Sequence, residues 1–332
     1  MQSTISRRSF LAVASCAVVS LAGLSACGSN QKTANAIRIG TMPTEDILPM
    51  WVAEAQGYFK EADVAAEIIV FDSAQNLSAA ITAGEVDIAM TDPMRTVKLC
   101  ESGTELSMEW ITLGTTPAQG RFGVMTCAES GMKTLADLQR GEKGVGVAAN
   151  TVPEYVFDKL CEQAGIDSAS IKTSEVASLP DRYSLMSANQ LDAAALPGSM
   201  LALGEATGMV LIADDSTGEN LSQSVMVARK AYKSGDSIKT LDSVRKVWDR
   251  AAEAINAEPE KYRSLLVEKA NLNEKVANTY PISEYPLSLK ADGSNAYPPA
   301  NLITPQLEWM KKKGYSTKNV AYDEADGSFV IS

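Results

Sequence analysis

Residues 74–90, AQNLSAAITAGEVDIAM, decide the fold of this chain. Residues 74–83 carry apolar side chains at helical spacing and are followed by Gly84, a residue that readily takes the positive φ of a helix end. Residues 86–90 then form a short apolar run typical of a buried strand. The stretch therefore predicts a helix that leads the chain directly back into a sheet.

The same alternation of short apolar runs and amphipathic segments continues on both sides of this stretch. Such alternation predicts a parallel sheet flanked by helices, and its restart at residue 144 predicts a second α/β unit. The expected strands are 36–41, 66–72, 86–90, 144–148, 171–175 and 192–196, and the expected helices are 46–57, 74–83, 152–164 and 179–188.

Two extended stretches divide the chain into lobes. We expect crossovers at residues 121–127 and 222–229, with the second connection starting near Asp214. The first lobe is then formed by residues 36–123 plus 222–332, and the second by residues 124–221. Four helices near the C-terminus should pack on the outside of the first lobe, at residues 241–256, 259–270, 274–280 and 299–313.

The first 26 residues have the composition of an export signal. They contain no acid, carry Arg7 and Arg8, and continue as an apolar and small-residue run that is short for a membrane-spanning helix. Residues 6–11 (SRRSFL) resemble the twin-arginine export signal, although the general route stays open. Residues 24–27 (LSAC) resemble a lipobox, which predicts lipidation at Cys27 and a lipid anchor on the extracytoplasmic face of the cell membrane. Residues 27–35 would be the lipidated tether.

Composition narrows the function classes. The chain has a net charge of −11, which disfavours nucleic-acid binding, and it has no histidine. No nucleotide-binding or nucleophile motif is present, so we expect no catalytic residue, no metal and no cofactor. Cys100, Cys127 and Cys161 fit no metal or redox spacing and are interpreted as small core residues, with one disulfide left open.

An ordered set of segments resembles the ABC transporter solute-binding proteins for nitrate, sulfonate, taurine and thiamine precursors. The segments are IRIG (37–40), PMWVAEAQGYF (49–59), LSAAITAGEVDIA (77–89), LADL (135–138), GVGV (144–147) and QLDAA (190–194). The resemblance implies a periplasmic binding protein type II fold, in which two α/β lobes are joined by a two-segment hinge. It also implies a monomer that captures a small molecule and delivers it to an ABC permease and its ATPase.

The candidate ligand-binding residues follow the strands, because ligands of open α/β sheets bind at the carboxyl ends of the strands. Asn150 and Thr151 precede a helix, where they would cap it or help its N-terminus to hold an anion. Trp51 would stack on a planar ligand or belong to the core. The full set of candidates is Thr41, Thr44, Trp51, Ser73, Thr91, Asp92, Thr115, Asn150, Thr151 and Ser199.

The identity of the ligand stays open, and so do two alternative functions of the protein. Asp46, Asp72 and Asp92 place negative charge near the expected cleft, which favours an organic molecule such as a pyrimidine or another heterocycle over nitrate, with sulfonates retained. The chain would also suit a ligand sensor for a membrane receptor. An enzyme resembling the pyrimidine-precursor synthases is disfavoured, because those enzymes rely on a histidine.

Overall fold

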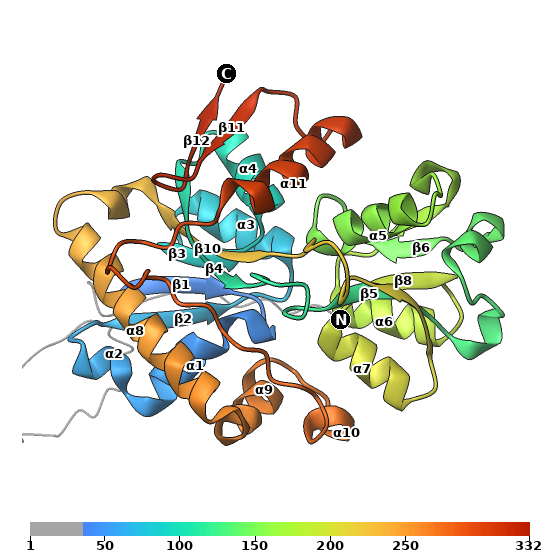
Figure 1. Ribbon diagram of the computed structural model, residues 1–332, viewed down its shortest axis with the longest axis horizontal. Coiled ribbons are helices and arrows are strands. Elements are labelled where there is room, and N and C mark those ends of the chain that lie inside the picture. The colour runs from blue at the N-terminus through green and yellow to red at the C-terminus, as the bar shows by residue number, and fades with distance from the viewer. Residues whose placement is uncertain (1–35) are drawn as a thin grey trace, which may run out of the picture. The chain divides into compact units, whose positions relative to one another are not determined.

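A strand from the second half of the chain lies inside the sheet that the first half builds. The computed structural model describes residues 36–332, so the predicted export signal, Cys27 and the tether lie outside the described residues. The first sheet has the order β2-β1-β3-β10-β4 (Figure 1), and β10 is antiparallel to both of its neighbours. Its strands are β1 (Ile37–Thr41), β2 (Ala66–Val70), β3 (Ile88–Thr91), β4 (Leu106–Leu113) and β10 (Ser224–Arg229).

The second sheet repeats this plan with the order β7-β6-β8-β5-β9. Here β6 is parallel to β7 and β8, whereas β5 is antiparallel to β8 and β9. Both sheets are therefore mixed, which corrects our expectation of purely parallel pairing. The strands are β5 (Phe122–Thr126), β6 (Val145–Val147), β7 (Thr173–Glu175), β8 (Ala193–Pro197) and β9 (Val210–Asp214).

Eleven α-helices and six 3-10 helices connect and cover the strands of the described residues. The α-helices are α1 (Leu48–Gln56), α2 (Tyr58–Glu61), α3 (Ala74–Ala83), α4 (Pro93–Glu101), α5 (Val152–Gln163), α6 (Leu179–Ser187), α7 (Gly198–Ala206), α8 (Ser237–Ala257), α9 (Arg263–Lys269), α10 (Glu274–Ala277) and α11 (Ala300–Lys313). The 3-10 helices are η1 (Glu45–Ile47), η2 (Ala128–Ser130), η3 (Leu135–Arg140), η4 (Ser168–Ser170), η5 (Lys230–Lys233) and η6 (Pro259–Tyr262). None of the helices in residues 36–332 is long and apolar enough to cross a membrane.

Residue alternation along the strands gives the first sheet two buried faces. In β3, Ile88 and Met90 belong to the core formed with α1 and α8, whereas Ala89 belongs to the core under α3, α4 and α11. Successive strand side chains point to opposite faces, so a strand with helices on both sides is apolar throughout. Figure 1 shows α1 and α8 on one side of this sheet and α3, α4 and α11 on the other.

The cysteines of the described residues take part in this packing as free thiols. Cys127 and Cys161 are buried, Cys100 is partly buried, and none of the three forms a disulfide. Burial raises the pKa of Cys100 to about 11 and that of Cys161 to about 12, so both stay protonated at neutral pH.

The C-terminal segment contacts both lobes, which differs from the expected packing on the first lobe alone. Helix α11 packs against α4 of the first lobe, and Trp309 Nε1 donates to Asp158 Oδ2 of α5 in the second lobe at 2.8 Å. The hydroxyl of Tyr315 donates to Glu154 of the same helix at 2.7 Å, and Lys313 forms an ion pair with Asp158. Beyond α11, the hairpin of β11 (Val320–Asp323) and β12 (Ser328–Ile331) lies beside β4, where Met108 N donates to Gly327 O at 2.8 Å.

Two crossing segments, residues 114–121 and 215–223, connect the two sheets. The expected boundary after residue 123 falls inside β5, because Phe122 and Gly123 already pair with β8. Of the stretches expected to act as the hinge, 121–127 is largely strand β5, whereas 214–229 contains the crossing segment 215–223 followed by strand β10. The crossing segments are tied together where Asn220 Nδ2 donates to Gly114 O at 3.0 Å and Ser222 Oγ donates to Gly120 O at 3.1 Å.

Gly114 is the position where the two crossing segments approach most closely. Its φ is +96°, and a Cβ added there would lie 2.0 Å from Ser222 O. We expect Gly114→Ala to lower the free energy of unfolding by about 3 kcal/mol or more, because the backbone of a crossing segment has to move. Denaturant unfolding would measure this loss.

Gly103→Ala is the matched control, because Gly103 has nearly the same φ (+95°) and no atom within 4 Å of an added Cβ. This substitution should lower the free energy of unfolding only by the strain of a positive φ, about 1–2 kcal/mol. Equal losses in the two variants would show that the close approach at Ser222 does not matter.

Candidate functional site

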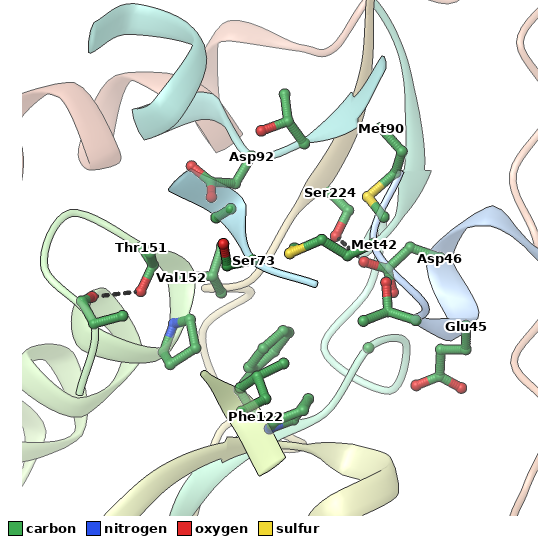
Figure 2. Close-up of a pocket in the computed structure, with 18 of the residues that line it drawn as sticks. Met42, Glu45, Asp46, Ser73, Met90, Asp92, Phe122, Thr151, Val152 and Ser224 are labelled. Atoms are coloured by element: carbon green, nitrogen blue, oxygen red, sulfur yellow. Dashed lines mark hydrogen bonds between the residues drawn. The ribbon is translucent and has the colours of Figure 1, made fainter. Parts of the chain in front are cut away.

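A cavity of about 100 Å³ lies between the two sheets and is lined by residues of both lobes. Most of its walls come from the turns that follow strands, as expected for ligand sites of α/β folds. A neighbouring groove of about 360 Å³ shares Met42, Asp72 and Ser199 with the cavity. Figure 2 shows Met42, Ser73 and Asp92 on one side of the cavity and Thr151, Val152 and Phe122 on the other.

The first lobe supplies helix-capping residues to the cavity wall. Ser73 is the N-cap of α3 and its Oγ accepts from Asn76 N at 3.2 Å. Asp92 is the N-cap of α4, where Oδ1 accepts from Arg95 N at 2.7 Å. Pro93 occupies the first helical position, which suits proline because no backbone donor is needed there.

The loop after β1 brings two more carboxylates to the cavity. Asp46 Oδ2 accepts from the hydroxyl of Ser224, the first residue of β10, at 2.6 Å. Glu45 Oε1 accepts from Tyr280 at 2.6 Å, while its Oε2 is buried without a hydrogen-bond partner. Neither carboxyl group forms an ion pair within residues 36–332.

Burial controls the protonation of these acids. Desolvation raises the pKa of Glu45 to about 8, against the hydrogen bond from Tyr280, and raises the pKa of Asp46. The pKa of Asp92 rises to about 6 for the same reason, although Arg95 opposes the shift. Glu45 is therefore largely neutral at pH 7, whereas Asp92 is largely charged.

The second lobe presents mostly neutral groups. Thr151 Oγ1 donates to Ala148 O at 2.6 Å, so this threonine does not cap α5 with its side chain (Figure 2). Glu154 Oε2 accepts from Asn150 N at 2.7 Å and places a carboxylate at the N-terminus of α5. An anion bound at this helix end would meet that carboxylate, so the local charge does not favour the anion-binding alternative.

Six of the ten predicted ligand residues line the cavity: Thr44, Ser73, Thr91, Asp92, Thr151 and Ser199. Trp51 does not, because it is 1% exposed and packs in the core with α8. Thr41 is buried below the cavity and donates to Met42 O, while Thr115 binds Gln119 in a crossing segment. Asn150 lies behind the wall with a φ of +57°, and its Nδ2 reaches Met94 O of the first lobe at 3.5 Å.

Several lining residues were missing from the predicted set. Met42 lies between the predicted residues Thr41 and Thr44, and Asp46 was expected near the cleft without being counted as a ligand residue, so the position of this loop after the first strand was a usable signal. Phe122, Arg182 and Ser224 come from β5, α6 and β10, and they reach the cavity only through pairing and packing between distant parts of the chain.

Comparison with known proteins places the chain in a family. A family model described as "NMT1/THI5 like" matches residues 44–262. The chain belongs to the NMT1/THI5-like family. Among curated proteins no sequence match was found.

Solved structures similar to this family member share its fold at low sequence identity. The aliphatic sulphonate binding protein SsuA from Escherichia coli has a TM-score of 0.69 at 18% identity, covering 90% of this chain and 93% of its own. The alkanesulfonate-binding protein SsuA from Xanthomonas axonopodis pv. citri, bound to MOPS, has a TM-score of 0.67 at 15% identity, with 85% and 93% covered. The nitrate-binding protein NrtA from Synechocystis PCC 6803 has a TM-score of 0.66 at 10% identity, with 85% and 82% covered. The fold is that of periplasmic binding protein type II, as the sequence predicted.

The raised pKa of Glu45 makes a testable contribution to the pH dependence of stability. Between the ordinary value of 4.5 and the folded value of about 8, the folded protein keeps a proton that the unfolded chain has released. This group therefore lowers the free energy of unfolding as pH rises through that window, by up to about 1.4 kcal/mol per pH unit. Glu45→Gln, which mimics the protonated form, should raise Tm at pH 7.5 and raise it less at pH 5.

The control for this prediction is Glu85→Gln, which changes an exposed carboxylate outside the cavity. Its Tm should differ from that of the unsubstituted protein by the same small amount at both pH values. If Glu45→Gln also gives a pH-independent difference, the protonated state of Glu45 is refuted.

Proposed function

We propose that this protein is the extracytoplasmic solute-binding component of an ABC importer. The cavity between the lobes carries this proposal, because it is lined from both sheets at the ends where α/β folds bind ligands. Membership of the NMT1/THI5-like family supports the same role, as do the structural neighbours, which are sulfonate-binding and nitrate-binding proteins.

The proposed mechanism is lobe closure around one small organic molecule, a sulfonate, a pyrimidine or a similar heterocycle. The boundaries between lobes lie in the crossing segments 114–121 and 215–223, and these segments form the hinge. The closed form docks as a monomer on a permease that works with an ATPase. No step of chemical catalysis is part of this role.

Filling the cavity tests whether it binds a ligand. Ser199 lies in the first turn of α7 and borders both the cavity and the neighbouring groove of about 360 Å³. Native mass spectrometry of the protein purified from its own cells should show a bound small molecule, and Ser199→Trp should lose that mass. Ser234→Trp, an exposed position outside the cavity, should keep it. Absence of any bound molecule, together with no Tm increase in a broad metabolite screen, would contradict the proposal.

Attachment to the membrane through Cys27 is part of the proposal. A lipid on the first residue of the processed chain would hold the receptor beside its permease, because several acyl chains give stable anchoring. Cys27→Ser should move the protein from the membrane fraction to the soluble fraction with no change in its Tm. Cys161→Ser serves as the control and should leave the protein at the membrane; retention of Cys27→Ser there would exclude a lipid anchor at Cys27.

A further inference from the structure

More acidic than basic residues line the cavity, and the two kinds differ in how they are paired. Carboxyl groups come from Glu45, Asp46, Asp72 and Asp92, all in the first lobe, and Glu45 is largely protonated at pH 7 because its pKa is about 8. The only basic lining residues are Arg121 and Arg182. The first lobe therefore presents an acidic wall.

Arg121 adds no free positive charge to the cavity. Its Nε pairs with Asp214 at 2.5 Å and its Nη2 with Glu205 at 2.9 Å. These two carboxylates more than balance one guanidinium, and they raise the pKa of Arg121. An anionic ligand would have to compete with both of them for this side chain.

Arg182 is committed to the backbone of the second lobe. It is 1% exposed, and its Nε and Nη1 donate to Val176 O and Ala195 O at 2.9 and 2.8 Å. This guanidinium holds the ends of two strands together under the opposite wall. Arg182 forms no ion pair with the acids of the first lobe among the described residues.

The two aspartates of the acidic wall have hydrogen bonds and no ion pair. Asp46 accepts from Ser224, and Asp92 accepts from the backbone N–H of Arg95. The Arg95 side chain instead donates across the cleft to Ala149 O at 3.1 Å, and it forms no ion pair with Asp92 among the described residues. Burial raises the pKa of both aspartates, and the nearby Arg95 guanidinium offsets only part of that effect at Asp92.

Two hydroxyls beside the aspartates are also without partners. Thr91 is 6% exposed, lines the cavity, and its side chain forms no hydrogen bond within residues 36–332. Thr44 Oγ1 is buried and likewise has no partner. A hydroxyl oxygen can accept from the N–H groups of a ligand, so these threonines add acceptors to an acidic wall.

The rest of the wall suits the apolar part of a ligand. Met42, Met90, Phe122 and Val152 border the cavity, and Figure 2 shows the two methionine side chains near Asp46 and Ser224. Methionine adapts to irregular shapes and packs well against aromatic rings and methyl groups. Carboxylates beside apolar surface favour a cation with a hydrocarbon or heteroaromatic body over a free sulfonate.

We propose that the cavity binds a small organic cation, an ammonium or a protonated nitrogen heterocycle, whose charged group lies against Asp46 and Asp92. This assignment rests on the proposed function and narrows its ligand class. The N–H groups of the cation donate to the two aspartates and to Thr91. Its apolar part lies against Met42, Met90 and Phe122.

The test compares matched cations and anions on the purified full chain. Choline, histamine and 4-aminopyridine form the cationic arm, and ethanesulfonate, methylphosphonate and nitrate form the anionic arm. Thermal shift and titration calorimetry at pH 7.5 should show dose-dependent stabilisation by at least one cation, with a Kd at least tenfold below that of any anion. Asp92→Asn and Asp46→Asn should each weaken cation binding at least tenfold while keeping their hydrogen bonds to Arg95 N and Ser224.

Asp242→Asn is the control, since Asp242 is exposed on α8 and does not line the cavity. It should leave cation binding unchanged. The Tm of each variant without ligand shows whether it has folded, and Asp92→Asn should have a Tm at or above that of the parent.

Each other outcome overturns the assignment. Tighter binding of an anion, a neutral molecule carried through purification, or full cation affinity in both aspartate variants would refute it while leaving a binding protein in place. Failure of both arms, together with no bound mass in the native protein, would refute the proposed function itself.

Discussion

The chain crosses twice between two sheets, and each crossing delivers a strand into the interior of a sheet. Strand β10 lies between β3 and β4, and β5 lies between β8 and β9. Neither lobe is therefore a continuous segment, and the two connections must run side by side. Gly114 and Ser222 make this possible, because a side chain at residue 114 would collide with the returning backbone. The position of the cavity follows from this arrangement, since the crossings bring the carboxyl ends of both sets of parallel strands toward each other.

The electrostatics of the cavity arise from how each lobe uses its charges. In the second lobe, Arg182 donates to backbone carbonyls, and Glu154 accepts from Asn150 N and from the C-terminal residues Tyr315 and Lys313, so their charges serve the folded structure. In the first lobe, the hydrogen bonds to Asp46 and Asp92 come from neutral donors, the Ser224 hydroxyl and the Arg95 backbone N–H. Because desolvation of a carboxylate is unfavourable without compensation, these aspartates are the part of the wall most sensitive to what occupies the cavity.

Local sequence signals were enough to predict many elements of the fold. The helix at 74–83 ends where Gly84 takes a φ of +74°, and Ser73 and Asp92 cap the helices that follow them. The antiparallel pairing of β5 with β8 and of β10 with β4 was not predictable, because it depends on contacts between residues far apart in the chain, such as Phe122 with Pro197 and Val225 with Ile111. Whether Trp51 contacts a ligand or belongs to the core depends on which face of α1 packs against α8, and the apolar periodicity of the sequence does not identify that face. The Glu154 carboxylate at the N-terminus of α5 was visible in the sequence as an acid in the first turn, but its bond to Asn150 N was not.

The C-terminal hairpin has a consequence for the behaviour of the protein at high concentration. Strand β4 lies at the edge of the first sheet, and all eight of its residues are buried. An uncovered apolar edge strand can pair with the same edge of another molecule and start aggregation. Gly327 and the strands on either side of it cover part of this edge, and the Gly327 carbonyl accepts the Met108 N–H that another chain would otherwise use. The last residues of the chain thus help to keep separate molecules from joining through their sheets.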